Sequence, residues 1–194
     1  MKGILISLFF MSLHLTLLVA QEASPLSLNY KEPDAALMQD FNDGFEVIVK
    51  GNLKDKFYKL YIVRCHENKA ERKELCSKVP CKADSVQCLF LSKPLSKDTI
   101  QLCCKYREEV NINLPALLIP QILMETYPSK TYFDTDCLPI MAFTTGTEKK
   151  FLIDGEYHSG LSFCDVRNSK THPSEWYEKF NIKDYIYFEL ELSD

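Results

Sequence analysis

Short stretches with a two-residue period of apolar side chains recur along this chain, and each ends at a turn signal. In residues 45–50, Phe45, Val47 and Val49 share one face of the stretch, which is the pattern of a β-strand. Residues 57–65 are rich in aromatic and β-branched side chains and predict a second strand. Because only a short loop separates these two strands, we expect them to pair antiparallel.

The same pattern continues toward the C-terminus, where Asp154-Gly155 forms a hairpin-type turn. Short helices are predicted over residues 34–41 and 174–180, and the charged residues 66–75 are expected to form a helical turn or a loop. Further strands are predicted at residues 85–92, 99–107, 110–114, 131–134, 138–144, 150–153, 156–166 and 185–192. Strands and helices do not alternate, so the sequence predicts a mainly β, antiparallel fold. It is either a β-barrel with one or two short flanking helices or a disulfide-stapled β-sandwich.

The chain contains twelve Phe, ten Tyr and one Trp, which either fill a core or line a cavity. In a barrel, Tyr61 and Val63 would point inward, whereas Leu60 and Ile62 would lie outside under one of the helices. Residues 114–124 are the most apolar stretch after the N-terminal segment, and we expect them to be a buried crossover, with a ligand- or membrane-facing lip as the alternative. The side chains predicted to line a ligand cavity are Phe45, Val47, Tyr61, Tyr132 and Phe143.

The N-terminal segment predicts secretion. Lys2 precedes an almost unbroken apolar run over residues 4–19, and the small residue Ala20 stands at a plausible cleavage point before Gln21, as in a signal peptide. We therefore expect residues 1–20 to be removed and residues 21–194 to form a single disulfide-rich domain without a membrane anchor. The 23 basic and 27 acidic residues are mixed along the chain, so no basic stripe indicates a nucleic-acid partner.

All eight cysteines follow the predicted leader, and six of them lie between residues 65 and 104. An even count in an oxidising compartment predicts four disulfide bridges but leaves their connectivity open. We expect one bridge between Cys65 and Cys164, joining an early strand to a late one. Because the spacing lacks paired C-x-x-C motifs, no metal site is predicted. The residues predicted to form bridges are Cys65, Cys76, Cys81, Cys88, Cys103, Cys104, Cys137 and Cys164.

No catalytic motif is recognisable in the sequence. The segment at residues 160–164, GLSFC, lacks the second glycine of a nucleophile elbow. Asp134 and Asp136 are close in sequence, but acids on a loop are usually only solvated. The sequence therefore predicts a protein that is not an enzyme and has no cofactor.

Three segments resemble the lipocalins secreted in tick saliva. EPDAALMQDFNDGFEVIVKG at residues 32–51 resembles their short helix and first strand, YFDTDCLPIMAF at 132–143 a late barrel strand, and GLSFCDVRNSKTHPSEWYEKF at 160–180 the closing helix. The chain lacks the G-x-W signature of ordinary lipocalins and has Trp176 where the family often has a cysteine. The resemblance implies a lipocalin-like barrel that captures small host mediators, such as biogenic amines or fatty-acid derivatives, or host proteins.

Two functions are consistent with these observations. The first is a secreted, monomeric binding protein that sequesters a small amphipathic ligand, either a biogenic amine or a lipid mediator, inside a β-barrel. The alternative is a secreted effector directed at an extracellular protein, such as a toxin, inhibitor or immune modulator, which acts through its surface loops. A cavity inside the barrel would favour the first function, and a filled core would favour the second.

Overall fold

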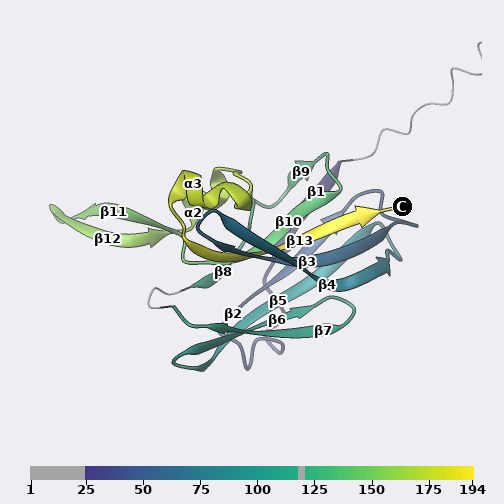
Figure 1. The fold of residues 1–194 in the computed structure, drawn as a ribbon, viewed down its shortest axis with the longest axis horizontal. Helices are drawn as coiled ribbons and strands as arrows, with labels where there is room; N and C mark the ends of the chain where they lie inside the picture. Colours follow the sequence, from purple (N-terminus) through teal and green to yellow (C-terminus); the bar gives the residue numbers. More distant parts are fainter. Residues whose placement is uncertain (1–24, 118–120) are drawn as a thin grey trace, which may run out of the picture.

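The computed structural model describes residues 25–117 and 121–194, so the predicted leader at residues 1–20 lies outside the described part of the chain. The mainly β, antiparallel class is confirmed (Figure 1), and the described strands pair antiparallel with their neighbours, with register shifts in the pairs β10–β13, β3–β4 and β5–β6. The strands are β1 (Leu26–Lys31), β2 (Asp43–Lys50), β3 (Phe57–His66), β4 (Lys69–Pro80), β5 (Ser85–Ser96), β6 (Thr99–Lys105), β7 (Glu109–Pro115), β8 (Ile122–Met124), β9 (Thr131–Phe133), β10 (Cys137–Thr144), β11 (Thr147–Ile153), β12 (Glu156–Ser162) and β13 (Asp184–Ser193).

These strands form two large sheets and one separate hairpin. Sheet A has the order β7-β6-β5-β2-β1-β9, sheet B has the order β4-β3-β13-β10-β8, and among the described strands β11 pairs only with β12. Both large sheets are open, with β7 and β9 at the edges of one and β4 and β8 at the edges of the other. The predicted closed barrel is therefore not confirmed.

The predicted pairing of the strands at residues 45–50 and 57–65 is wrong. Strand β2 lies between β1 and β5 in sheet A, whereas β3 lies between β4 and β13 in sheet B. The loop at residues 51–56 carries the chain from one sheet to the other, and Leu53 within this loop is fully buried in the core. Burial of this side chain favours a crossover between the sheets over a simple hairpin.

The two large sheets share one apolar core. Val47, Val49 and Phe90 contribute to it from sheet A, and Leu60 and Phe188 contribute from sheet B. The ring centroids of Phe90 and Phe188, which come from opposite sheets, lie 4.6 Å apart. At this level the space between the sheets is therefore filled by side chains.

The predicted orientation of β3 is also reversed. Leu60 and Ile62 point into the core between the sheets, whereas Val63 belongs to a second apolar cluster on the opposite face of sheet B. That second cluster is covered by the C-terminal helices and is centred on Trp176. Because β3 is apolar on both faces, its sequence alternation could not decide which face is the inner one.

Three short helical segments follow the hairpin: α2 (Cys164–Asn168), the 3₁₀ turn η1 (Pro173–Glu175) and α3 (Trp176–Phe180). They confirm a helix close to residues 174–180, but the segment at 34–41 forms only hydrogen-bonded turns. The charged residues 66–75, which were expected to be a turn or a loop, lie mostly in β4. Most side chains of β4 are exposed, as suits an edge strand that uses charge to prevent pairing with another molecule.

None of the eight cysteines is paired in this structure, so the predicted four bridges are not formed. The predicted bridge between Cys65 and Cys164 is among those that the structure lacks. Cys65 is buried on the helix-covered face of β3, whereas Cys164 is exposed at the start of α2.

The apolar stretch at residues 114–124 is only partly buried. Leu114, Leu123 and Met124 are buried, but Leu117 and Ile122 are exposed. Leu118 and Ile119 of this stretch lie outside the described part of the chain. The exposed Leu117 contributes to the candidate site.

Candidate functional site

The inner face of sheet B changes from apolar to charged toward one end of the sheet. Along β3 the core-facing residues are Leu60 and Ile62, and the same face continues with Arg64 and His66. Arg64 and His66 are exposed, so this end of the strand face is open to solvent. The charged side chains thus face the space between the sheets without being enclosed by it.

Neighbouring strands extend this charged region. On β13, Ile186 lies opposite Arg64, and Asp184 lies opposite His66. On β4, Glu71 pairs with Arg64, and Lys69 pairs with His66. Three adjacent strands therefore bring two acids, two bases and a histidine to the same end of one sheet face.

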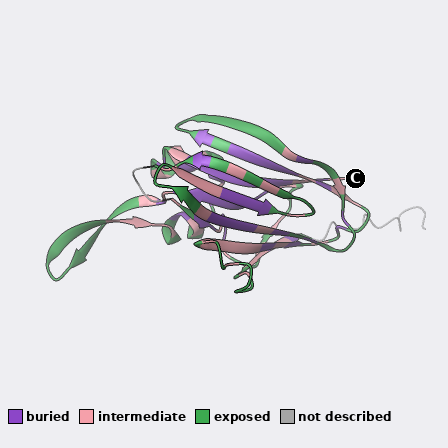
Figure 2. Ribbon diagram, turned by 90° about the horizontal axis from the view of Figure 1, so that it is seen from below, coloured by how far each residue is buried: buried purple, intermediate pink, exposed green. Residues whose placement is uncertain are grey.

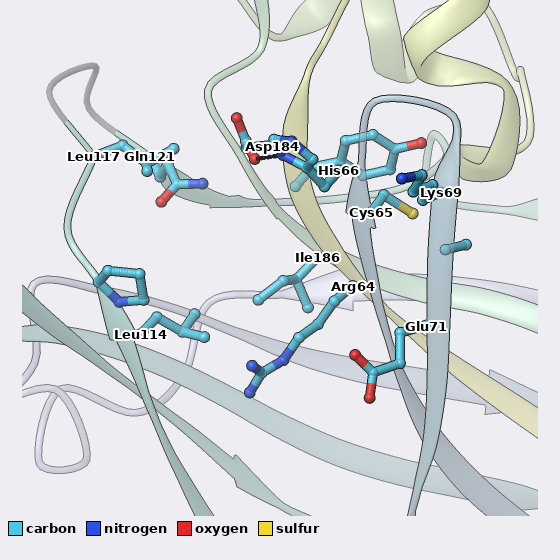
Figure 3. Close-up of a pocket in the computed structure, with 13 residues that line it drawn as sticks. Arg64, Cys65, His66, Lys69, Glu71, Leu114, Leu117, Gln121, Asp184 and Ile186 are labelled. Atoms are coloured by element: carbon cyan, nitrogen blue, oxygen red, sulfur yellow. Dashed lines mark hydrogen bonds and ion pairs between the residues drawn. The ribbon is translucent and has the colours of Figure 1, made fainter.

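A hollow of about 360 Å³ lies between this charged region and the last residues of β7 (Figure 3). Leu114 and Pro115 line it from β7, and Leu117 lies two residues beyond the end of that strand. Figure 3 shows the side chains of Arg64 and Ile186 reaching into the space between the two walls. The hollow is therefore amphipathic, with an apolar wall from the β7 side and a charged wall from sheet B.

His66 and Asp184 form an ion pair at one end of the hollow. His66 Nδ1 lies 2.5 Å from Asp184 Oδ1, and this hydrogen bond raises the pKa of His66 above its usual value of about 6.5. A protonated His66 would neutralise the carboxylate of Asp184. Within the described residues, Arg64 makes no ion pair and no side-chain hydrogen bond, so its guanidinium group is free to meet a ligand.

A second hollow of about 710 Å³ adjoins the first. It lies beside the base of the β11–β12 hairpin, and Leu117 and Asp184 line both spaces. Phe180 and Ile182 supply apolar surface to this second hollow. A ligand too long for the first hollow could therefore extend past Leu117 toward the C-terminal helix.

The five side chains predicted to bind a ligand do not face one common space. Val47 and Phe143 are buried in the core between the sheets, and Phe45 packs against that core. Tyr61 lies on the opposite face of β3, where the guanidinium carbon of Arg72 is 3.3 Å from its ring centroid. Tyr132 is exposed on the edge strand β9. Their assignment as ligand-binding residues stays a prediction.

Sequence reasoning missed Arg64 and His66 as site residues, although a signal was present. Counting in steps of two from Leu60 gives Ile62, Arg64 and His66, so a charged pair continues an apolar strand face. The opposite choice of inner face, which put Leu60 and Ile62 outside, puts Arg64 on the same outer face. The contribution of Asp184 required the pairing of β3 with β13, which residues so distant in sequence do not reveal.

The described residues include no group of three or more His, Cys, Asp or Glu side chains placed to hold a metal ion. Within the same part of the chain, no helix is long and apolar enough to cross a membrane. Comparisons with protein-family models, curated proteins and solved structures found no match. The resemblance to tick-saliva lipocalins therefore stays a prediction.

Proposed function

We propose that this protein is a secreted binding protein that holds a small amphipathic anion, such as a fatty-acid-type lipid mediator, in the hollow between β7 and sheet B. The observation that carries the proposal is the free guanidinium group of Arg64 opposite an apolar wall. The volume of the hollow, about 360 Å³, falls within the range of about 300–1,000 Å³ that is common for ligand pockets.

The charges favour an anionic ligand over an amine. Arg64 and Lys69 are both cationic, and His66 adds a third positive group when it is protonated. Asp184 is occupied by its hydrogen bond to His66, which leaves Glu71 as the acid available to a ligand. A planar guanidinium group can donate two parallel hydrogen bonds to a carboxylate, which fixes the orientation of the head group.

The apolar part of such a ligand would contact Leu114, Leu117 and Ile186. Leu114 and Ile186 are already buried, whereas Leu117 is exposed. Filling the site would therefore remove from water the apolar surface of Leu117 and of the ligand itself, and each square ångström removed contributes about 25 cal/mol. The ligand in this proposal lies at the open end of two packed sheets, not inside a closed barrel. The proposal keeps the ligand class that the lipocalin resemblance implies and changes its location.

Titration with 11-(dansylamino)undecanoic acid, a fluorescent fatty acid, tests the proposal. We expect saturable binding to the wild-type protein and a loss of affinity of about tenfold or more in Arg64→Gln, because a charge-assisted hydrogen bond contributes about 1.5–3 kcal/mol. Arg107→Gln is the matched control, since Arg107 is also exposed but lies in the turn between β6 and β7, at the opposite end of β7 from Leu114 and Pro115. Histamine, as an amine probe, should not compete. Absence of saturable binding, or equal loss in both variants, would refute the assignment.

A further inference from the structure

The β11–β12 hairpin stands apart from the body of the molecule. It projects to the left in Figure 1, and most of its length is exposed in Figure 2. Its contacts with the body are at its base, where Lys149 Nζ lies 2.8 Å from Asp165 Oδ2 and Thr147 Oγ1 donates to the Phe180 carbonyl. The distal half is therefore presented to solvent on both faces.

Four large apolar or aromatic side chains are exposed in this distal half. The exposed fractions are 39% for Phe151, 64% for Leu152, 53% for Ile153 and 78% for Tyr157. The register places Leu152 opposite Tyr157 on one face, while Phe151 and Ile153 lie on the other. Apolar surface concentrated in one projecting element is typical of an interaction site, because leaving it in water is unfavourable.

The shape of the hairpin is well defined although no other element of the described chain covers its distal half. Asp154 and Gly155 both have positive φ, 52° and 87°, as a two-residue type I′ turn requires. The Phe151 ring packs over Gly160, where an added Cβ would come within 3.0 Å of the ring. Seven cross-strand pairs continue without a register shift. A partner would therefore meet a preformed surface, which lowers the entropic cost of binding.

Both edges of the hairpin are available for pairing. The two-residue turn makes Ile153 and Glu156 a hydrogen-bonded pair, so the backbone N–H groups of Leu152 and Tyr157 point outward. Natural edge strands usually discourage pairing with proline, bulges or dense charge. The described register of β11 and β12 has no bulge, and neither strand contains proline. The charged run Glu148-Lys149-Lys150 lies toward the base of β11, which leaves the apolar residues 151–153 near the tip without such charge. These edges can thus accept a further strand.

The charges at the tip indicate a protein partner. Asp154 and Glu156 are the acids nearest the exposed apolar side chains, and neither forms an ion pair with another described residue. Insertion of this tip into a lipid bilayer would bury two carboxylates at high cost. A basic side chain on a protein partner could instead pair with them, so the tip is complementary to a strand that combines apolar residues with Lys or Arg.

We propose that the β11–β12 hairpin binds an extended strand of another protein by adding it to one of its edges, with apolar side chains of that strand contacting Leu152 and Tyr157 and its basic side chains pairing with Asp154 and Glu156. Backbone hydrogen bonds supply affinity in this type of recognition, and alternate side chains supply specificity.

Selection from phage-displayed random twelve-residue peptides tests the proposal on the full folded protein. We expect enrichment of peptides in which apolar residues alternate with Lys or Arg. Binding of the enriched peptides should weaken by about tenfold or more in Leu152→Ser and in Tyr157→Ser, as for central residues of an interface. Leu95→Ser is the matched control, because Leu95 is exposed to a similar degree on β5, outside the hairpin. Lys150→Pro and Ser159→Pro each remove one outward N–H, from β11 and β12 respectively, and one of them should abolish binding.

Three results would overturn this inference. The first is no enrichment, or binding that survives both serine substitutions. The second is binding to phosphatidylcholine–phosphatidylglycerol vesicles that these substitutions abolish, which would identify a membrane as the partner. The third is a concentration-dependent dimer that the same substitutions dissociate, which would identify a second copy of this chain. Binding of the dansylated fatty acid near Arg64 should remain unchanged in all hairpin variants, so it separately reports on the proposed ligand site.

Discussion

Replacement of Trp176 by alanine should destabilise the protein more than any exposed substitution. Trp176 is the single tryptophan of the chain and is fully buried. Its ring packs against Tyr185 of β13 with centroids 5.4 Å apart, and its Nε1–H donates to the Thr171 carbonyl at 3.1 Å. It is therefore the main contact through which α3 covers the outer face of sheet B.

The burial and the hydrogen bond of Trp176 determine how much unfolding free energy each substitution should cost. Truncation of a buried tryptophan to alanine removes its transfer free energy and leaves a cavity, which costs about 3–5 kcal/mol. Trp176→Phe retains most of the packing but leaves the Thr171 carbonyl without its donor, which costs about 1–3 kcal/mol. The exposed Leu37→Ala serves as the control, with an expected change within about 0.5 kcal/mol.

Urea unfolding followed by far-UV circular dichroism would measure these differences, because this signal comes mainly from the peptide backbone. The expected order of destabilisation is Trp176→Ala, then Trp176→Phe, then Leu37→Ala. A loss below about 1 kcal/mol for Trp176→Ala would mean that the C-terminal helices do not stabilise sheet B, and the argument for a second apolar layer would fail.

Two further predictions concern titration and thiol chemistry. The hydrogen bond to Asp184 raises the pKa of His66. The contribution of this ion pair to stability is therefore fully present below about pH 6.5 and is lost as the pH rises through the folded-state pKa of His66. NMR titration of His66 should give a midpoint above about 6.5, and this midpoint should fall in Asp184→Asn. Anion binding near Arg64 should weaken over the same rise in pH. Cys164 is exposed, whereas burial raises the pKa of Cys88 to about 12 and that of Cys104 well above its usual value. The thiol reagent dithionitrobenzoate should therefore react with Cys164 in a fast first phase, and Cys164→Ser should remove this phase. Equal rates for buried and exposed thiols would contradict the observed burial.

The sequence was sufficient to predict most strands because their local patterns are strong. The Asp154-Gly155 turn, for example, specifies its hairpin through backbone conformation alone. Strand β4 was missed because, as an exposed edge, it lacks an apolar face and its charges resemble those of a loop. The sequence could not predict which strands pair with β2 and β3. Leu53, in the loop between them, is buried in the core, and this burial depends on side chains from the whole chain.

The residues of the candidate site were even harder to predict from the sequence than the strand pairing. Neighbouring residues in a strand point to opposite faces, so an error of one residue in assigning the inner face of β3 moves every side chain to the other face. Tyr61 was expected on the inner face, but that face carries Arg64 instead. Packing decides this choice: Leu60 and Ile62 belong to the core that contains Phe90 and Phe188. That core fills the space in which a barrel would hold its ligand. The space available to a ligand thus moves to the end of sheet B, where Arg64 and His66 continue the face that Leu60 and Ile62 begin.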